Sequence, residues 1–312
     1  MKVGDLVRYK FGRNSDFKSS NLYKHKDIYN ILVNRKGIVL SFQDYDDMKL
    51  ANGEKIFLFA SIAWFGKEEL FLENITIRYL NEQRLGTPFL IDFYISKIEN
   101  EKIEVFQEMK NLETKKISAT ALSIYKFNLQ RKKIKKEVEN FLLEYPNKYK
   151  TAPFYAKKKG LLNIKDLKLD YIKLHNYPNI FDSFCGLAYK KNGGSDFFLD
   201  ASDYMGIVSA AVPNLLQMSN HSIYETNIGG AAVEYEFRFY DFVKQDSCIK
   251  LLSGLRNIKN KTYTWSHWLI DIDNEKILAI ANSVIVAIDL KNRKSVQVPI
   301  KLKNALEKII ME

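Results

Sequence analysis

The chain of 312 residues is long enough for two ordinary domains, and its hydrophobic content of 46% with only six prolines argues against extensive disorder. No apolar stretch reaches the roughly 18 residues of a membrane-spanning helix, and the start of the chain lacks the apolar run of a signal peptide, so we expect a cytoplasmic protein without a membrane span. Cys185 and Cys248 match no zinc, redox or disulfide pattern, and we expect both to be buried, inert thiols.

The net charge of +11 would favour a nucleic-acid partner if the basic residues were clustered. Most of them are instead mixed with acidic residues. The densest basic run, RKKIKKEVEN at 131–140, has apolar Ile134, Val138, Phe141 and Leu142 at helical spacing. This pattern predicts one amphipathic helix with a solvated basic face, and we therefore expect no nucleic-acid partner.

Along the chain, the segment DIYNILVNRKGIV at 27–39 predicts a strand that leads through Gly37 into a helix. The basic helix and the Pro- and Lys-rich stretch YPNKYKTAPFYAKKKG then form a linker within 131–195. The segment DFFLDASDYMGIV at 196–208 again predicts a strand followed by a helix. Four long strands are expected after each of these entries, at 70–80, 88–98, 102–110, 116–127, 230–241, 247–259, 262–273 and 276–289.

Two internal matches indicate that the halves of the chain are repeats. Gly37 and the Ile-Val that follows it recur at Gly206, an offset of 206 − 37 = 169. In the strands, KISATALS at 116–123 matches KILAIANS at 276–283, and Arg78 matches Arg238, an offset of 238 − 78 = 160. The matching Ala and Ser residues alternate, so they point to one face of a strand and leave room for something bulky.

One helix with four or five antiparallel strands in each repeat predicts an α+β fold. A strongly curved sheet can wrap around a single helix, an arrangement known as the hotdog fold. We expect two tandem hotdog domains that form an intrachain pseudo-dimer: residues 1–150 with the basic helix at their end, and residues 151–312 with the linker at their start. Further pairing of this pseudo-dimer into a homo-oligomer stays open.

The second half resembles the 4-hydroxybenzoyl-CoA thioesterase branch of the hotdog superfamily, whose signature is an Asp, two residues, then Gly-Ile-Val or Gly-Val-Val. DYMGIV at 203–208 carries it, and VIVAIDLKNRKSVQVP at 284–299 resembles the family's last strand and basic turn. The tandem arrangement resembles the double-hotdog thioesterases. The resemblance implies hydrolysis of an acyl-CoA or acyl-carrier-protein thioester without a metal, with coenzyme A only as part of the substrate. The positive charge suits the phosphates of coenzyme A and acidic carrier proteins.

Asp203 is the catalytic candidate that this resemblance implies, as nucleophile or as general base for water, with the helix N-terminus as oxyanion hole. Carried over by position, Gly206 would shape the turn into the helix, and Ala210 would supply a backbone N–H. Unpaired N–H groups in a first helical turn favour the negative charge that develops on a tetrahedral intermediate. The alternative for Asp203 is a helix N-cap without a further role.

The first half has Asn34 at the position of Asp203. Asn can cap a helix but cannot become an ionised base, so we expect this site, with Gly37 as its glycine, to be degenerate or used for acyl binding. Glu225 follows the second helix, where some relatives have a second carboxylate. It is a secondary candidate, and a surface acid is the alternative.

The histidines have no partner at catalytic or metal-ligand spacing, and we expect surface or half-buried residues at His25, His175, His221 and His267. Their spacing counts against a hotdog dehydratase or hydratase, which relies on an Asp–His pair. Tyr263, Trp265 and Trp268 indicate core or interface packing. A non-catalytic acyl-binding or scaffold protein, in which duplication kept the fold while the sites decayed, is the alternative from another class.

Overall fold

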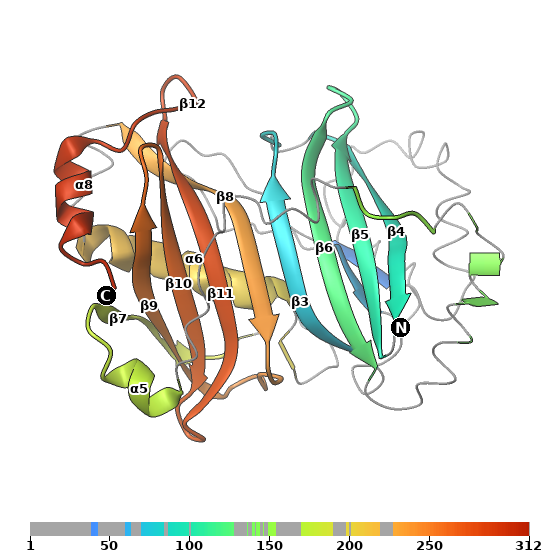
Figure 1. Cartoon of the computed structure of the whole chain (residues 1–312), viewed down its shortest axis with the longest axis horizontal. Coiled ribbons are helices and arrows are strands. Elements are labelled where there is room, and N and C mark those ends of the chain that lie inside the picture. The colour runs from blue at the N-terminus through green and yellow to red at the C-terminus, as the bar shows by residue number, and fades with distance from the viewer. Residues whose placement is uncertain are drawn as a thin grey trace, which may run out of the picture.

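The computed structural model describes residues 39–42, 60–63, 70–83, 87–99, 101–127, 149–153, 170–189, 198–199, 201–218 and 227–311, together with single residues between 136 and 146. Most of the described strands form one large antiparallel sheet of ten strands, in the order β4-β5-β6-β3-β8-β11-β10-β9-β7 with β12 paired to β11 (Figure 1). Few helices accompany this sheet in the described part of the chain. The architecture is therefore α+β, as the sequence predicts.

The strands of the first half are β1 (Val39–Phe42), β2 (Ala60–Ala63), β3 (Leu70–Tyr79), β4 (Phe89–Glu99), β5 (Lys102–Asn111) and β6 (Ile117–Phe127). Those of the second half are β7 (Ile180–Leu187), β8 (Ile228–Phe239), β9 (Cys248–Ile258), β10 (Thr262–Asp271), β11 (Lys276–Asp289) and β12 (Lys294–Ser295). The described helices are α5 (Tyr171–His175), α6 (Ala201–Met218) and α8 (Ile300–Glu307).

The eight long strands expected from the sequence are confirmed, each with ends within two residues of the observed ones. Alternating apolar residues between short polar turns predict such strands well, because the two-residue period matches a sheet with one face on the core. Within the expected basic helix, Lys136, Glu139 and Asn140 have helical backbone and exposed side chains. A solvated basic face is consistent with these residues.

Two expectations from the sequence are wrong. Val39–Phe42, expected to begin the first helix, forms strand β1 and pairs antiparallel with β2 (Ala60–Ala63), because tertiary pairing overrides local preference. The two cysteines are free but not buried: Cys185 is exposed and Cys248 is partly exposed. Their exposure follows from their place, since β7 is the edge strand of the sheet and Cys248 is the first residue of β9.

The two halves meet in the middle of the sheet, where β3 pairs with β8 (Figure 1). Thr76 lies opposite Glu236, and Arg78 lies opposite Glu234. Thr76 and Glu236 are separated by 236 − 76 = 160 residues, the same offset at which the strands of the two halves match in sequence. A two-fold axis through this pair would produce such a register.

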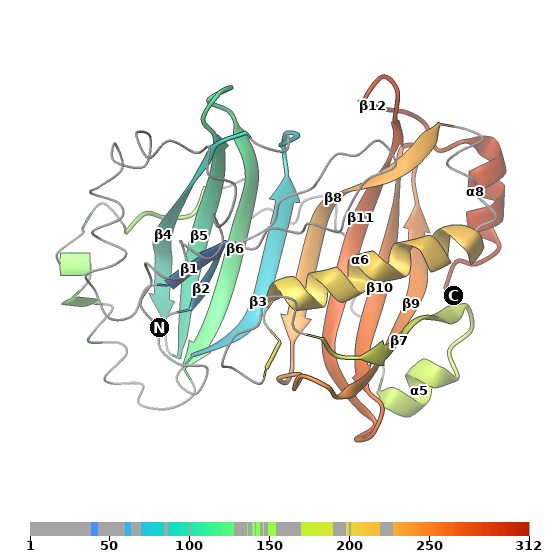
Figure 2. The ribbon, with the colours of Figure 1, turned by 180° about the vertical axis from the view of Figure 1, so that it is seen from behind.

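Helix α6 crosses one face of the sheet, and its first turns lie over the strands where the halves meet (Figure 2). Tyr204 and Val208 of α6 belong to a buried cluster that includes Phe237 from the second half and Ile75 and Ile77 from the first. A single core therefore joins the halves. Burying apolar side chains from both stabilises their association as well as each half.

The other described helices, α5 and α8, pack at the far end of the sheet. On the side of α6, Leu302 of α8 packs with Trp265 of β10 and Leu215 of α6. On the opposite side, Trp268 packs with Leu174 of α5. Trp265 and Trp268 are thus core residues, as the sequence indicated.

Candidate functional site

Asp203 lies in the first turn of α6, which begins at Ala201. Only 3% of its surface is exposed, and its neighbours Ser202 and Tyr204 are also buried. A carboxylate in a first helical turn is stabilised by the N–H groups that have no partner inside the helix and by the helix dipole. The sequence expectation of an acid at the start of this helix is met in position.

The start of α6 lies where the two halves join. The hydroxyl of Tyr79, at the end of β3, donates to the sulfur of Met205 over 3.6 Å. The Tyr79 ring also packs edge-on against Tyr235 of β8, with centroids 6.5 Å apart. Residues of the first half therefore contact the helical turn next to Asp203, so the surroundings of this acid are built by both halves of the chain.

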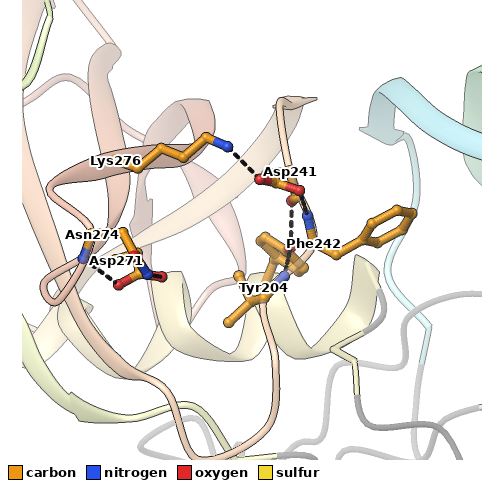
Figure 3. A network of polar contacts seen from close by, with 7 residues as sticks. Tyr204, Asp241, Phe242, Asp271, Asn274 and Lys276 are labelled. Atoms are coloured by element: carbon orange, nitrogen blue, oxygen red, sulfur yellow. Dashed lines mark hydrogen bonds and ion pairs between the residues drawn. The ribbon is translucent and has the colours of Figure 1, made fainter.

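The turn between β8 and β9 fixes the beginning of α6 (Figure 3). The hydroxyl of Tyr204 donates to the carbonyl of Asp241 over 3.2 Å and accepts from the backbone N–H of Val243 over 3.1 Å. The N–H of Leu199, just before α6, donates to the carbonyl of Val243 over 2.8 Å. The backbone on both sides of Asp203 is therefore tied to one turn.

This turn is itself held by neighbouring groups. The Asp241 carboxylate accepts from the N–H of Phe242 over 2.8 Å and pairs with Lys276 at the start of β11. The hydrogen bond from Lys276 keeps the pKa of the Asp241 carboxyl below its usual range. The Phe242 ring meets Phe71 of the first half edge-on, with centroids 5.1 Å apart. The adjoining turn closes through Asn274, whose backbone and side chain donate to Asp271 (Figure 3).

Beneath α6, the sheet of the second half carries the small-residue face expected from the sequence. Ala279, Ala281 and Ser283 of β11 are all buried. A small cavity lies between this part of the sheet and the helix, lined by Tyr204, Val208, Phe237, Leu251, His267, Leu269, Ala279 and Ala281. Small side chains on the strand leave space there that larger ones would fill.

His267 lines this cavity and is almost completely buried, with 2% of its surface exposed. The expectation that it lies at or near the surface is therefore wrong. Its Nδ1 lies 2.8 Å from the hydroxyl of Ser253, and its Nε2 lies 3.2 Å from that of Ser283. The Ser253 hydroxyl lies 2.6 Å from that of Ser183 on β7. These partners lie on other strands, so spacing along the sequence could not reveal them.

The other histidines differ from His267. His175 is exposed at the end of α5, where its Nδ1 lies 3.0 Å from the carbonyl of Tyr171. His25 and His221 lie outside the described residues. Within the part of the chain that the structure describes, no group of three or more His, Cys, Asp or Glu residues could hold a metal ion. No described helix is long and apolar enough to cross a membrane.

The structure places the other candidates as follows. Gly206 lies inside α6, five residues after its first residue, and not at the turn into the helix. Ala210 is exposed in the middle of the same helix, where an α-helix engages the backbone N–H internally. Asn34, Gly37 and Glu225 lie outside the described residues. Among the sequence candidates that the structure describes, Asp203 is therefore the one that lies in the first turn of α6.

No family model and no curated protein matches the chain. Among solved structures, the chain is similar to a 12:0-ACP thioesterase from Umbellularia californica, with 13% identity, 71% of this chain and 75% of that chain covered, and a TM-score of 0.48. It is also similar to a putative oleoyl thioesterase from Lactobacillus plantarum, with 9% identity, 70% and 75% coverage, and a TM-score of 0.48. An acyl-ACP thioesterase from Bacteroides thetaiotaomicron gives 9% identity, 69% and 76% coverage, and a TM-score of 0.41.

These structures are named as thioesterases, the class to which the sequence resemblance points.

Proposed function

We propose that the protein is an acyl thioesterase that hydrolyses an acyl-CoA or acyl-carrier-protein thioester at Asp203. The observation that carries this proposal is the buried carboxylate in the first turn of α6, on a helix that packs over a small-residue face of the sheet. A capping aspartate needs no burial, because a cap works equally well at an exposed helix end. The DYMGIV signature supports the same assignment.

The chemistry needs a base or nucleophile and a site for negative charge. Asp203 either takes a proton from water, whose oxygen attacks the thioester carbonyl, or attacks the carbonyl itself to form an anhydride that water then opens. In both routes the C–S bond breaks, and the departing thiolate takes up a proton to give the free thiol. Backbone N–H groups of the first turn of α6 stabilise the oxyanion. Ala210 is unsuited to this role, because its N–H lies in mid-helix.

The proposal includes a double-hotdog arrangement with two unequal sites and a domain boundary near residue 150. The register of β3 against β8, centred on Thr76 and Glu236, supports an intrachain pseudo-dimer. In the first repeat Asn34 replaces the acid, and an amide does not ionise as a base. The second repeat would therefore hold the competent catalytic site, and the equivalent site of the first repeat would lack an acid.

Asp203→Asn tests the proposal directly. The change keeps the size of the side chain and removes its charge, so hydrolysis should fall by roughly 10²- to 10⁴-fold while the fold is retained. Asp273→Asn is the matched control, since Asp273 is exposed on the turn after β10. The measurement is thiol release from a panel of short, medium, long and aromatic acyl-CoAs and acyl carrier proteins, with circular dichroism to check the fold.

The alternatives make different predictions in this assay. A scaffold or acyl-binding protein would release no thiol from any substrate. A hydratase would add water to an enoyl thioester without releasing thiol. The nearest observation in favour of a hydratase is that His267 lines the same cavity as Tyr204, but both ring nitrogens of His267 already contact serine hydroxyls. Hydrolysis therefore remains the function that the site supports best.

A further inference from the structure

Three phenylalanine rings link the first half of the chain to the start of α6. Phe242 lies on the turn between β8 and β9, which also holds Tyr204 (Figure 3). Phe71, on β3 of the first half, meets the Phe242 ring edge-on, with centroids 5.1 Å apart. Phe198, just before α6, packs against the same ring, with centroids 5.4 Å apart. Phe242 is thus in contact with both the first half and the approach to α6.

Backbone contacts join the approach to α6 to the same turn. Phe198 forms an antiparallel bridge with the turn, and the N–H of Leu199 donates to the carbonyl of Val243 over 2.8 Å. Val243 directly follows Phe242, so a shift of the Phe242 ring moves the backbone to which Leu199 is bonded. Asp203 comes one helical turn further along the chain. The place of its carboxylate therefore depends on where Phe242 is held.

The strands around this contact have counterparts in the other half, at the offset of 160 residues between Arg78 and Arg238. In its pairing with β6, β3 skips one residue after Leu72, and in its pairing with β11, β8 skips one after Ala232 (232 − 72 = 160). After each of these two strands, the first two N–H groups donate to a single carbonyl of the neighbouring strand. Residues at this offset therefore occupy equivalent places in the structure.

The counterparts of the two contacting rings are different residues. Phe71 corresponds to Ala231 (231 − 71 = 160), and Phe242 corresponds to Glu82 (242 − 82 = 160). Neither counterpart has a ring, and Glu82 forms an ion pair at the surface instead. The aromatic contact thus accompanies the repeat with the buried acid and has no counterpart for the repeat that carries Asn34. A contact that only held the junction together would be expected at both places of a pseudo-dimer.

We propose that Phe71 is a positioning residue, through which the first half acts as the activating partner of the Asp203 site. This inference rests on the proposed thioesterase function and adds the regulation of its site. Phe71 acts through Phe242 and the approach to α6, and not on the substrate. Misplacing a reacting group by about 1 Å can lower a rate by about 10²-fold, so a ring contact at this distance can control catalysis.

The first test is kinetic and uses thiol release from the thioester that the wild type hydrolyses fastest. Phe71→Ala, which leaves the same side chain as at Ala231, should lower kcat roughly 10- to 100-fold and change KM less than about twofold. Phe71→Leu keeps most of the apolar volume without the ring, and its kcat should fall only about threefold. The leucine variant decides the question if Phe71→Ala does not fold.

The second test is amide hydrogen exchange, which needs no substrate. The N–H of Leu199 donates to Val243, and the N–H of Val243 donates to Tyr204, so both amides report the attachment of α6 to the turn. Phe71→Ala should speed their exchange about tenfold and leave the amides of α8 unchanged, with a smaller effect in Phe71→Leu. A purely structural role would instead speed exchange in α8 as well.

Two variants serve as controls for both tests. Glu82→Ala removes the side chain at the counterpart of Phe242, and Phe181→Ala removes a ring that is half-buried like that of Phe71 but lies on the edge strand β7. Both variants should keep the kcat of the wild type and its exchange at Leu199.

The inference is overturned if the kcat of the folded Phe71 variants stays at the wild-type value, if KM rises in place of a fall in kcat, if exchange rises equally in α8, or if either control has the effect of Phe71→Ala. Failure of the thioesterase proposal has a different result. In that case the wild type hydrolyses no thioester, while faster exchange at Leu199 and Val243 in Phe71→Ala still supports the positioning role, and unchanged exchange overturns it.

Discussion

Burial changes the acid–base behaviour of His267. Desolvation lowers the pKa of its imidazole in the folded protein to about 3, from the ordinary value of 6.5. Below about pH 6.5 the unfolded chain takes up a proton that the folded state refuses. The contribution of His267 to the free energy of unfolding is therefore fully present above pH 6.5 and is lost as the pH falls toward 3.

We expect the free energy of unfolding of the wild type to fall more steeply with acid than that of His267→Gln. Between pH 7 and pH 4 the difference between the two proteins should change by about 3 kcal/mol, since each pKa unit corresponds to about 1.4 kcal/mol. Urea denaturation at both pH values measures it. A difference that does not depend on pH would mean that folding leaves the pKa of His267 at its ordinary value.

At the scale of elements, the attachment of α6 to the turn between β8 and β9 depends on one hydroxyl. Tyr204→Phe removes the bonds to Asp241 and Val243 and leaves the buried N–H of Val243 without this acceptor. We expect a loss of about 2 kcal/mol in the free energy of unfolding and a lower kcat for thioester hydrolysis. Tyr189→Phe is the control, because Tyr189 is 67% exposed. Equal effects of both changes would contradict the role of Tyr204.

Strand β8 has two adjacent glycines directly after its first residue, Ile228, and they differ in their surroundings. A Cβ at Gly230 would lie 2.5 Å from the hydroxyl of Tyr263 and 2.7 Å from Ile285, whereas one at Gly229 would lie 3.2 Å from the flexible side chain of Leu290. Gly230→Ala should therefore destabilise the protein by about 1–3 kcal/mol, and Gly229→Ala by clearly less. Thermal unfolding of the pair checks this order, and the reverse order would contradict the close approach of Tyr263.

At the scale of the whole molecule, a buried ion pair crosses the junction between the halves. Nε of Arg78 lies 3.2 Å from the Glu234 carboxylate, and 13% and 5% of the two side chains are exposed. Arg78→Ala removes this contact from a buried carboxylate, so the free energy of unfolding should fall by about 3 kcal/mol. Lys97→Ala, which breaks an exposed pair with Glu99, should change it little. Similar effects of both variants would exclude a special role for the junction.

The register of β3 against β8 could be anticipated from the sequence. The offset of 160 residues between Arg78 and Arg238, found from the matching strands, is the offset of the pair at the centre of the β3–β8 junction. The long strands and the small-residue face of β11 were also predictable. Alternation of apolar residues is local information, and it determines which face of a strand is buried.

The candidate site was only partly predictable. Asp203 and its place at the start of α6 follow from the DYMGIV segment, but the helix begins early enough to place Gly206 and Ala210 inside it. The Tyr204 hydroxyl bonds to a turn 37 residues away, and no short sequence motif predicts that contact. The exposure of Cys185 depends on which strand lies at the edge of the sheet, which local pattern does not specify.

By itself, the sequence determined the repeat, the long strands and the position of one acid at a helix start. Only the tertiary structure decided that His267 is buried beneath α6, that Ser253 and Ser283 from the two neighbouring strands contact its ring, and that Ser183 from a further strand bonds to Ser253. The physical reason is that backbone periodicity is encoded over a few residues, whereas the partners of a buried polar side chain are brought to it by strand order and register.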